Sequence, residues 1–191
     1  MKLTQPIRNA SDVHKLLEHY KINHHPRNHL LITLGIHTAL RISDILNLNC
    51  NDVYNFANNT IRKIITITEK KSKKLKTIAL NKSIISALTA YFPEATPNTP
   101  LISNPKTGRA ITRVQAYRII REAADMVGID FVVSCHSLRK TFGYHSWTGG
   151  ISPVVLMEIY NHSSYAITKR YLGITQDDQN AVYLDMNFTA K

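Results

Sequence analysis

The stretch that decides the fold of this chain is Asn161-His162-Ser163-Ser164-Tyr165-Ala166-Ile167-Thr168-Lys169-Arg170-Tyr171. Two upstream segments hold groups that can act with it, namely Ala39-Leu40-Arg41-Ile42-Ser43-Asp44 and Cys135-His136-Ser137-Leu138-Arg139-Lys140. The candidate set is a pair of arginines, a pair of histidines and one late tyrosine: Arg41, Arg139, His136, His162 and Tyr171. These side chains are the parts needed to hold a phosphodiester, stabilise its pentavalent transition state and attack it without a metal ion.

The composition predicts a soluble protein with a polyanionic partner. With 191 residues and 43% hydrophobic content, the chain is long enough to bury one core. It carries 24 Lys and Arg against 13 Asp and Glu, and its net charge of +11 favours nucleic acid as the partner. A cationic membrane protein is disfavoured because the chain has no apolar run long enough to span a bilayer and no secretory start. We therefore expect a cytoplasmic location, which suits two cysteines, Cys50 and Cys135, that form no disulfide framework.

Apolar spacing predicts an α+β fold that is mainly α-helical and has a small antiparallel β-sheet. The first helices are expected to begin near Ser11, Pro26 and Ile42. Further helices are expected at about 81–91, 112–127, 138–148, 153–160, 165–171 and 175–186. The β-branched segments 61–68 and 75–80 predict a hairpin with its turn at 70–74.

Arg41 stands between an apolar helix and the short helix that contains Asp44. Taken alone, it is most simply interpreted as a surface arginine that caps a helix or pairs with Asp44. The alternative is a guanidinium that grips two non-bridging oxygens of one phosphate, with Asp44 orienting it from behind. Arginine does this better than lysine because its planar fork donates two parallel hydrogen bonds.

His136 and Arg139 are three residues apart at the start of a predicted helix. This spacing places both side chains on one face of the helix. The pair is a weak signal by itself, since many helices carry one by chance. A histidine can nevertheless move a proton near neutral pH, because its ordinary pKa is about 6.5.

Together, these segments resemble the catalytic domain of tyrosine recombinases of the phage integrase family. The resemblance covers roughly residues 5–186 and is closest to short, stand-alone integrases and fimbrial-switch invertases. It implies functional roles at Arg41, Asp44, Lys71, His136, Arg139, His162 and Tyr171. Longer relatives carry an N-terminal core-binding domain, and none fits before residue 10. We therefore expect residues 1–191 to form a single catalytic domain without that clamp.

Tyr171 is the expected nucleophile among nine tyrosines. It follows His162 by nine residues and comes directly after a basic pair, while Tyr165 is the alternative. In the family, the position of His162 holds a histidine or a tryptophan that hydrogen-bonds the phosphate. A phenol with a pKa of about 10 attacks slowly unless cations stabilise the phenolate, which the two arginines would do.

A lysine-rich turn, 69–76, carries the general acid that the resemblance implies. Counting back from Ala79-Leu80 places this lysine at Lys71, and Lys73 is the alternative because five lysines in the turn leave the register open. By itself the run is a basic patch that contacts the DNA backbone. Contacts of this kind are expected from Lys70, Lys73, Lys74, Lys140, Lys169 and Arg170.

The resemblance also implies a mechanism and partners. Tyr171 would form a 3′-phosphotyrosyl link while Lys71 protonates the leaving 5′ oxygen, and His136 would handle the tyrosine proton. The partner would be double-stranded DNA, bound by four protomers on paired sites. The protomers would exchange C-terminal segments, here 177–188. An accessory DNA-bending protein is compatible with this assembly. No metal or nucleotide cofactor is expected. The rival classes are a relaxing enzyme of the type IB topoisomerase kind and a catalytically silent DNA-binding regulator with the same fold.

Overall fold

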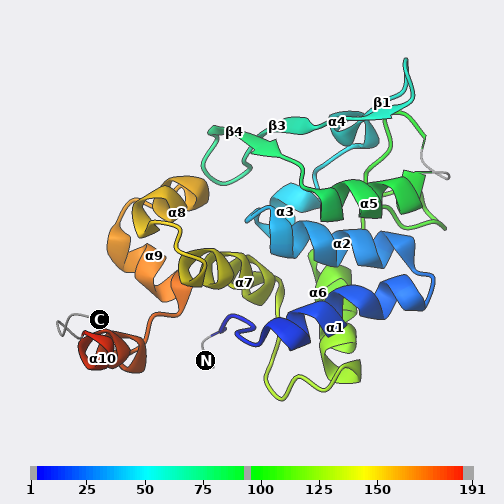
Figure 1. Cartoon of the computed structure of the whole chain (residues 1–191). Helices are drawn as coiled ribbons and strands as arrows, with labels where there is room; N and C mark the ends of the chain where they lie inside the picture. Colours follow the sequence, from blue (N-terminus) through cyan, green and yellow to red (C-terminus); the bar gives the residue numbers. More distant parts are fainter. Residues whose placement is uncertain (1–3, 93–95, 187–191) are drawn as a thin grey trace.

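Helix α2 (Pro26–His37) lies at the centre of the fold (Figure 1). The computed structural model describes residues 4–92 and 96–186. Every residue of α2 from Leu30 to Ile36 is buried, as expected of a helix that is covered on all sides. Its main neighbours are α1 (Ala10–Ile22), α5 (Lys82–Tyr91) and α7 (Cys135–Thr148).

A glycine allows α2 and α7 to pack closely. A Cβ atom at Gly35 would lie 2.7 Å from Leu138 Cδ1, so a larger residue would force the two helices apart. Arg139 follows Leu138 on α7 and donates a hydrogen bond to the carbonyl oxygen of Ala39, just after the end of α2. The packing of two core helices thus places Arg139 beside the loop that carries Arg41.

Two short antiparallel ladders flank the helices. β1 (Tyr54–Asn55) pairs with β2 (Thr60–Ile61), and β3 (Ile64–Thr68) pairs with β4 (Leu75–Ala79). In the second ladder Ile65 lies opposite Ile78, and both face the core. The predicted hairpin is present, but its first strand begins at residue 64 rather than 61 because Ile61 pairs with Tyr54 in the other ladder.

The remaining helices follow the predicted order, except that α4 was not predicted. They are α3 (Ile42–Ile45), α4 (Cys50–Val53), α6 (Arg113–Met126), α8 (Pro153–Tyr160), α9 (Tyr165–Leu172) and α10 (Gln176–Asp185). The expectation of a mainly helical α+β fold is confirmed. Across the part of the chain that the structure describes, no helix combines the length and apolar character needed to cross a membrane.

Helix α7 begins earlier than predicted, at Cys135 rather than at residue 138. Ser134 caps the helix, because its hydroxyl accepts a hydrogen bond from the backbone N–H of Ser137 at 3.3 Å. His136 and Arg139 therefore lie on the same regular helix.

The segment before α1 runs along α7 and reaches the end of α9. The backbone N–H of Ile7 donates to Thr141 Oγ1 at 2.9 Å, and Arg8 Nη2 donates to the carbonyl oxygen of Gly173 at 2.5 Å. Gly173 ends α9 in the left-handed conformation, with φ at 68°. These contacts fasten the N-terminal residues to the helix that carries Tyr171.

Helix α10 stands apart from the core (Figure 1). None of its residues is buried, and Leu184 is 84% exposed. Positions 187 and 188 of the predicted exchange segment lie outside the described residues. The described part of that segment is therefore a helix whose apolar side chains are left exposed by residues 4–92 and 96–186.

Candidate active site

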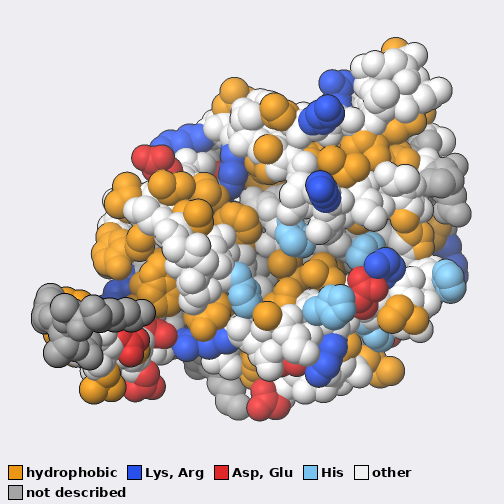
Figure 2. All heavy atoms as spheres, viewed as in Figure 1, with side chains coloured by type: hydrophobic (Ala, Val, Ile, Leu, Met, Phe, Trp, Pro, Cys, Tyr) orange, Lys and Arg blue, Asp and Glu red, His pale blue; other side chains and the backbone are white. Residues whose placement is uncertain are grey.

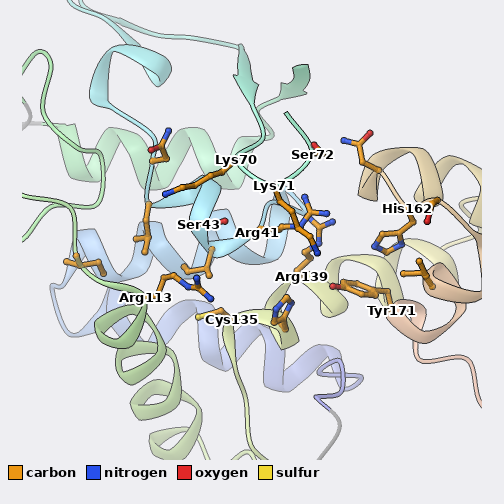
Figure 3. Close-up of a pocket in the computed structure, with 18 residues that line it drawn as sticks. Arg41, Ser43, Lys70, Lys71, Ser72, Arg113, Cys135, Arg139, His162 and Tyr171 are labelled. Carbon is orange, nitrogen blue, oxygen red and sulfur yellow. The ribbon is translucent and has the colours of Figure 1, made fainter. Parts of the chain in front are cut away.

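A cleft of about 830 Å³ lies between the β3–β4 turn, helix α3 and helices α7 to α9 (Figure 3). All six residues predicted to act in catalysis line it: Arg41, Lys71, His136, Arg139, His162 and Tyr171. They come from the loop after α2, the β3–β4 turn, α7, the α8–α9 connection and α9. Segments that are far apart in the sequence therefore meet at one cavity.

Arg41 is held by a carboxylate that the sequence did not single out. It precedes α3 in an extended conformation, and its Nη1 lies 3.0 Å from Glu69 Oε1. The Glu69 side chain is completely buried, whereas 18% of the Arg41 side chain remains exposed. The buried carboxylate therefore orients the guanidinium while the cationic group still lines the cleft.

The prediction that Asp44 orients Arg41 is wrong, because Asp44 bonds to a different group. Asp44 Oδ1 accepts a hydrogen bond at 2.9 Å from the backbone N–H of Lys70, and Asp44 Oδ2 is buried with no hydrogen-bond partner among the described residues. The short helix α3 turns Asp44 toward the backbone of the β3–β4 turn rather than toward Arg41. Asp44 supports the site by holding that turn.

Arg139 is the most deeply buried of the site residues, with 1% of its surface exposed. Its Nη1 donates to the carbonyl oxygen of Ala39 and its Nη2 donates to that of Tyr160, the latter at 3.0 Å. The guanidinium carbon also lies 4.7 Å from the centre of the Tyr160 ring. Each terminal nitrogen carries two N–H groups, so one on each is left beyond these two bonds.

Tyr171 lies among the histidines and the buried arginine. Its ring centre is 4.6 Å from that of His162 and 6.5 Å from that of His136. The guanidinium carbon of Arg139 is 5.8 Å from the ring, and the hydroxyl of Tyr171 is directed toward Arg139 in Figure 3. The alternative nucleophile, Tyr165, is half exposed at the start of α9 and does not line the cleft.

Both site histidines are held in their neutral form. Burial, followed by the charges of Arg139 and Arg41, lowers the pKa of His162 to about 4. Burial and the nearby Arg139 also lower the pKa of His136. The ring of His162 stacks on Tyr160, and its Nδ1 lies 3.0 Å from Thr168 Oγ1. A neutral imidazole can accept a proton or donate one hydrogen bond to a phosphate.

The lysine-rich turn places only some of its lysines at the cleft. Lys70 and Lys71 line it, and Figure 3 shows Lys71 beside the two arginines. Lys73 and Lys74 are exposed and do not line the cleft. Lys73 adopts a left-handed conformation with φ at 58°, which turns the chain back toward β4. This placement favours Lys71 over Lys73 as the residue closest to the reacting groups.

The remaining cations expected to contact DNA lie on two different helices. Lys140 is buried on α7, where its ammonium donates to the carbonyl oxygen of Thr4. Its prediction as a DNA contact therefore does not fit this structure, in which it anchors the N-terminal segment. Lys169 and Arg170 lie on α9 outside the lining of the cleft, with Arg170 exposed.

Sequence reasoning missed three residues that support the site, Glu69, Lys76 and Asn161. Glu69 accepts hydrogen bonds from Ser72 and Asn161 in addition to Arg41. It is the only acidic residue between Asp52 and Glu94, and its place at the head of a lysine run was an available signal. Lys76 and Asn161 carry no comparable local signal, because their partners lie far away in the chain.

The cleft presents groups that recognise a phosphate. Within residues 4–92 and 96–186, no group of three or more His, Cys, Asp or Glu side chains is placed to hold a metal ion. The cleft instead presents guanidinium and ammonium groups from Arg41, Arg139 and Lys71. Such groups recognise a phosphodiester by charge-assisted hydrogen bonds.

Comparisons with known proteins agree with this arrangement. A family model described as "Phage integrase family" matches residues 9–177. The probable integrase/recombinase YoeC of Bacillus subtilis is 38% identical over 183 residues, which is 96% of this chain and 97% of that protein. The tyrosine recombinase XerD of Mycobacterium tuberculosis is 27% identical over 157 residues, and the match covers 78% of this chain but only 48% of XerD.

Solved structures share the fold. The crystal structure of XerA recombinase matches with a TM-score of 0.78 at 19% identity, over 96% of this chain and 67% of that one. XerH site-specific recombinase, in a pre-cleavage complex with its difH substrate, matches with a TM-score of 0.72 at 21% identity, over 95% of this chain and 54% of that one.

Proposed function

Because this chain belongs to the phage integrase family of tyrosine-type site-specific recombinases, we propose that it cuts and rejoins double-stranded DNA through a covalent 3′-phosphotyrosine intermediate. The single observation that carries the proposal is the meeting of Tyr171 with two arginines and two histidines at one cationic cleft. The geometry supports an attack on a phosphodiester, since the tyrosine lies where cations can stabilise its phenolate.

In the first step, the Tyr171 oxygen attacks the scissile phosphorus. A bond forms between that oxygen and phosphorus, and the bond from phosphorus to the 5′ oxygen breaks. His136 takes the phenolic proton, for which its neutral form is suited. Lys71 gives a proton to the departing 5′ oxygen, so the products are a 3′-phosphotyrosyl enzyme and a free 5′ hydroxyl.

Charge on the phosphoryl oxygens is stabilised by Arg41, Arg139 and His162. The arginines are fixed before DNA binds: Glu69 holds Arg41, and two backbone carbonyl oxygens hold Arg139. Donors that are already oriented stabilise a transition state without reorganising when the reaction occurs. In the second step the 5′ hydroxyl of a partner strand gives its proton to Lys71 and attacks the phosphorus. A bond from phosphorus to that 5′ oxygen forms, the bond to the Tyr171 oxygen breaks, and His136 returns the proton to the phenolate.

DNA binding is assigned to the cleft and to the cations around it. Lys70, Lys73 and Lys74 extend from the turn, and Lys169 and Arg170 from α9. The net charge of +11 supports contacts of this kind with the phosphate backbone. We assign the whole chain to one catalytic domain that acts in the cytoplasm.

Assembly on paired sites is assigned to α10. Its apolar side chains are exposed among the residues that the structure describes, and a second exposed apolar surface lies over α8 and α9 (Figure 2). Val154, Val155 and Tyr165 of that surface are each about half exposed. In a tetramer, α10 of one protomer would cover apolar surface on the next.

The test of the nucleophile is a nicked DNA substrate whose short 5′-hydroxyl fragment diffuses away after cleavage and so traps the covalent complex. The sequence of the substrate would come from a search of the DNA that flanks the gene for inverted repeats. Tyr171→Phe should form no denaturant-resistant adduct while its DNA affinity stays within about threefold of wild type, because only the nucleophilic oxygen is removed. Tyr165→Phe is the matched control and should form the adduct normally. Adduct that persists in Tyr171→Phe and disappears in Tyr165→Phe would reverse the assignment.

A further inference from the structure

The cleft has two walls that come from separate parts of the chain. One wall is the β3–β4 turn, which carries Lys71, and the other is the connection from α8 to α9, which carries His162 (Figure 3). The turn ends a two-stranded ladder, and a ladder of this size is only marginally stable by itself. Lys71 lies beside Arg41 and Arg139 in Figure 3, so repulsion between like charges favours an outward displacement of the turn.

Lys76 provides the first tie between the walls. It lies on β4 opposite Ile67, and its ammonium donates a hydrogen bond at 2.7 Å to the carbonyl oxygen of Ile159 in the last turn of α8. Carbonyl groups in the last turn of a helix lack partners within the helix and attract cations. Lys76 is partly buried, and this burial, followed by the charge of Arg139, lowers its pKa to about 8.

Glu69 and Asn161 provide the second tie. Asn161 ends α8 in a left-handed conformation, with φ at 52° and ψ at 44°, and directly precedes His162. Its side-chain Nδ2 donates to Glu69 Oε2 at 2.8 Å, and Ser72 Oγ donates to the same oxygen at 2.7 Å. Burial alone would raise the pKa of Glu69, but hydrogen bonds from Ser72 and Asn161 and the charge of Arg41 hold it below its ordinary value. The carboxylate is therefore charged and joins the turn to Asn161 on the opposite wall and to Arg41.

We propose that Lys76, Glu69 and Asn161 form a clasp that fixes the β3–β4 turn against the α8–α9 connection and thereby positions Lys71 for proton donation. Glu69 and Lys76 lie outside the cleft lining, and Asn161 lines the cleft but has its side-chain amide directed to Glu69, so we treat all three as positioning residues. This inference rests on the proposed function, in which Lys71 is the general acid. It goes beyond that function because it says that the clasp holds Lys71 in place.

A sulfur leaving group gives a direct test of positioning. A substrate with sulfur in place of the bridging 5′ oxygen releases a thiolate, which needs no proton, so loss of the general acid no longer slows cleavage. The variants are Lys71→Met, Lys76→Met, Lys76→Arg and Asn161→Gly. Glycine at position 161 keeps the left-handed backbone and removes only the amide. Lys63→Met is the matched control, since Lys63 is an exposed lysine of the same hairpin that lies outside the cleft lining.

Cleavage rates at saturating DNA, DNA affinities and melting temperatures are measured for each variant on both substrates. We expect Lys76→Met and Asn161→Gly to cleave the oxygen substrate roughly 10- to 100-fold more slowly than wild type, which is the size of effect that misplacing a reacting group by about 1 Å produces. On the sulfur substrate both should return to within a few-fold of wild type, as Lys71→Met should. Lys76→Arg, which retains a donor, should recover most of the rate, and Lys63→Met should match wild type.

The outcomes separate the clasp from the proposed function. If sulfur rescues Lys71→Met while Lys76→Met and Asn161→Gly remain slow, the clasp is refuted and the proposed function stands. The same holds if Lys76→Met and Asn161→Gly cleave the oxygen substrate at the wild-type rate. If sulfur fails to rescue Lys71→Met itself, the assignment of the general acid is refuted, and the clasp with it. Should Lys76→Met not fold, as its melting curve would show, Asn161→Gly decides the question.

Discussion

Replacing Arg139 by lysine tests whether the site needs a planar guanidinium or only a positive charge. Arg139 joins three parts of the chain at once, because its terminal nitrogens hold the carbonyl oxygens of Ala39 and Tyr160 while the rest of the group faces the cleft. A lysine ammonium sits on a single flexible stem and has no fork. It cannot reproduce both bonds and also present two donors to one phosphate.

The size of the effect follows from the lost contacts. One buried carbonyl group would lose its donor, which costs about 1–3 kcal/mol of stability. At about 2–4 °C per kcal/mol for a chain of this length, the melting temperature should fall by roughly 2–12 °C. The rate should fall further, since removal of one oriented donor to a developing oxyanion costs about 100- to 1,000-fold.

The assay follows formation of the denaturant-resistant adduct on the nicked substrate at saturating DNA, with affinity and melting temperature measured on the same preparations. Arg109→Lys is the matched control, because Arg109 is exposed and lies outside the cleft lining. It should retain wild-type cleavage. Wild-type cleavage by Arg139→Lys would refute the requirement for a fork at this position.

Two further predictions concern acid pH and assembly. Because the pKa of His162 is lowered to about 4 in the folded chain, the unfolded chain binds more protons between about pH 6.5 and 4, so the free energy of unfolding should fall as pH drops through that window. His162→Phe should show a weaker dependence when melting is followed across the same range, and an unchanged profile would contradict the shift. Deleting residues 176–191 should leave binding to a single site within about threefold of full length but prevent complexes on paired sites in gel-shift experiments. The physical reason is that no residue of α10 is buried in the described part of the chain. Paired-site complexes that form normally without this segment would show that α10 does not link protomers.

The sequence was most informative where the signal is local. The helices other than α4, the hairpin and the family were predicted correctly because apolar spacing and short motifs such as that around Tyr171 lie within a few turns of chain. The start of α7 was missed because Ser134 caps the helix at a position where the apolar pattern has not yet begun. The roles assigned to the six catalytic candidates stay predictions, although the structure brings all of them to one cleft.

The errors concern which side chains pair with one another, not which segments form the helices and the hairpin. Asp44 is near Arg41 in the sequence, yet Arg41 pairs with Glu69, 28 residues away. Lys140 is a cation next to a motif, but it is buried against the carbonyl oxygen of Thr4, 136 residues away. Side-chain pairing across such separations depends on how helices and strands pack, which local spacing does not determine.

The attachment of the N-terminal segment to α7 and α9 has a practical consequence for engineered fusions. Arg8 donates a hydrogen bond to the carbonyl oxygen of Gly173, two residues after Tyr171. A bulky protein fused ahead of Thr4 would therefore pull on the helix that carries Tyr171. A flexible Gly/Ser spacer in front of Thr4 would let the fused protein move without pulling on that helix, because such a linker behaves as a random coil. Cargo for genome targeting should therefore be joined through such a spacer, with residues 4–8 left unaltered.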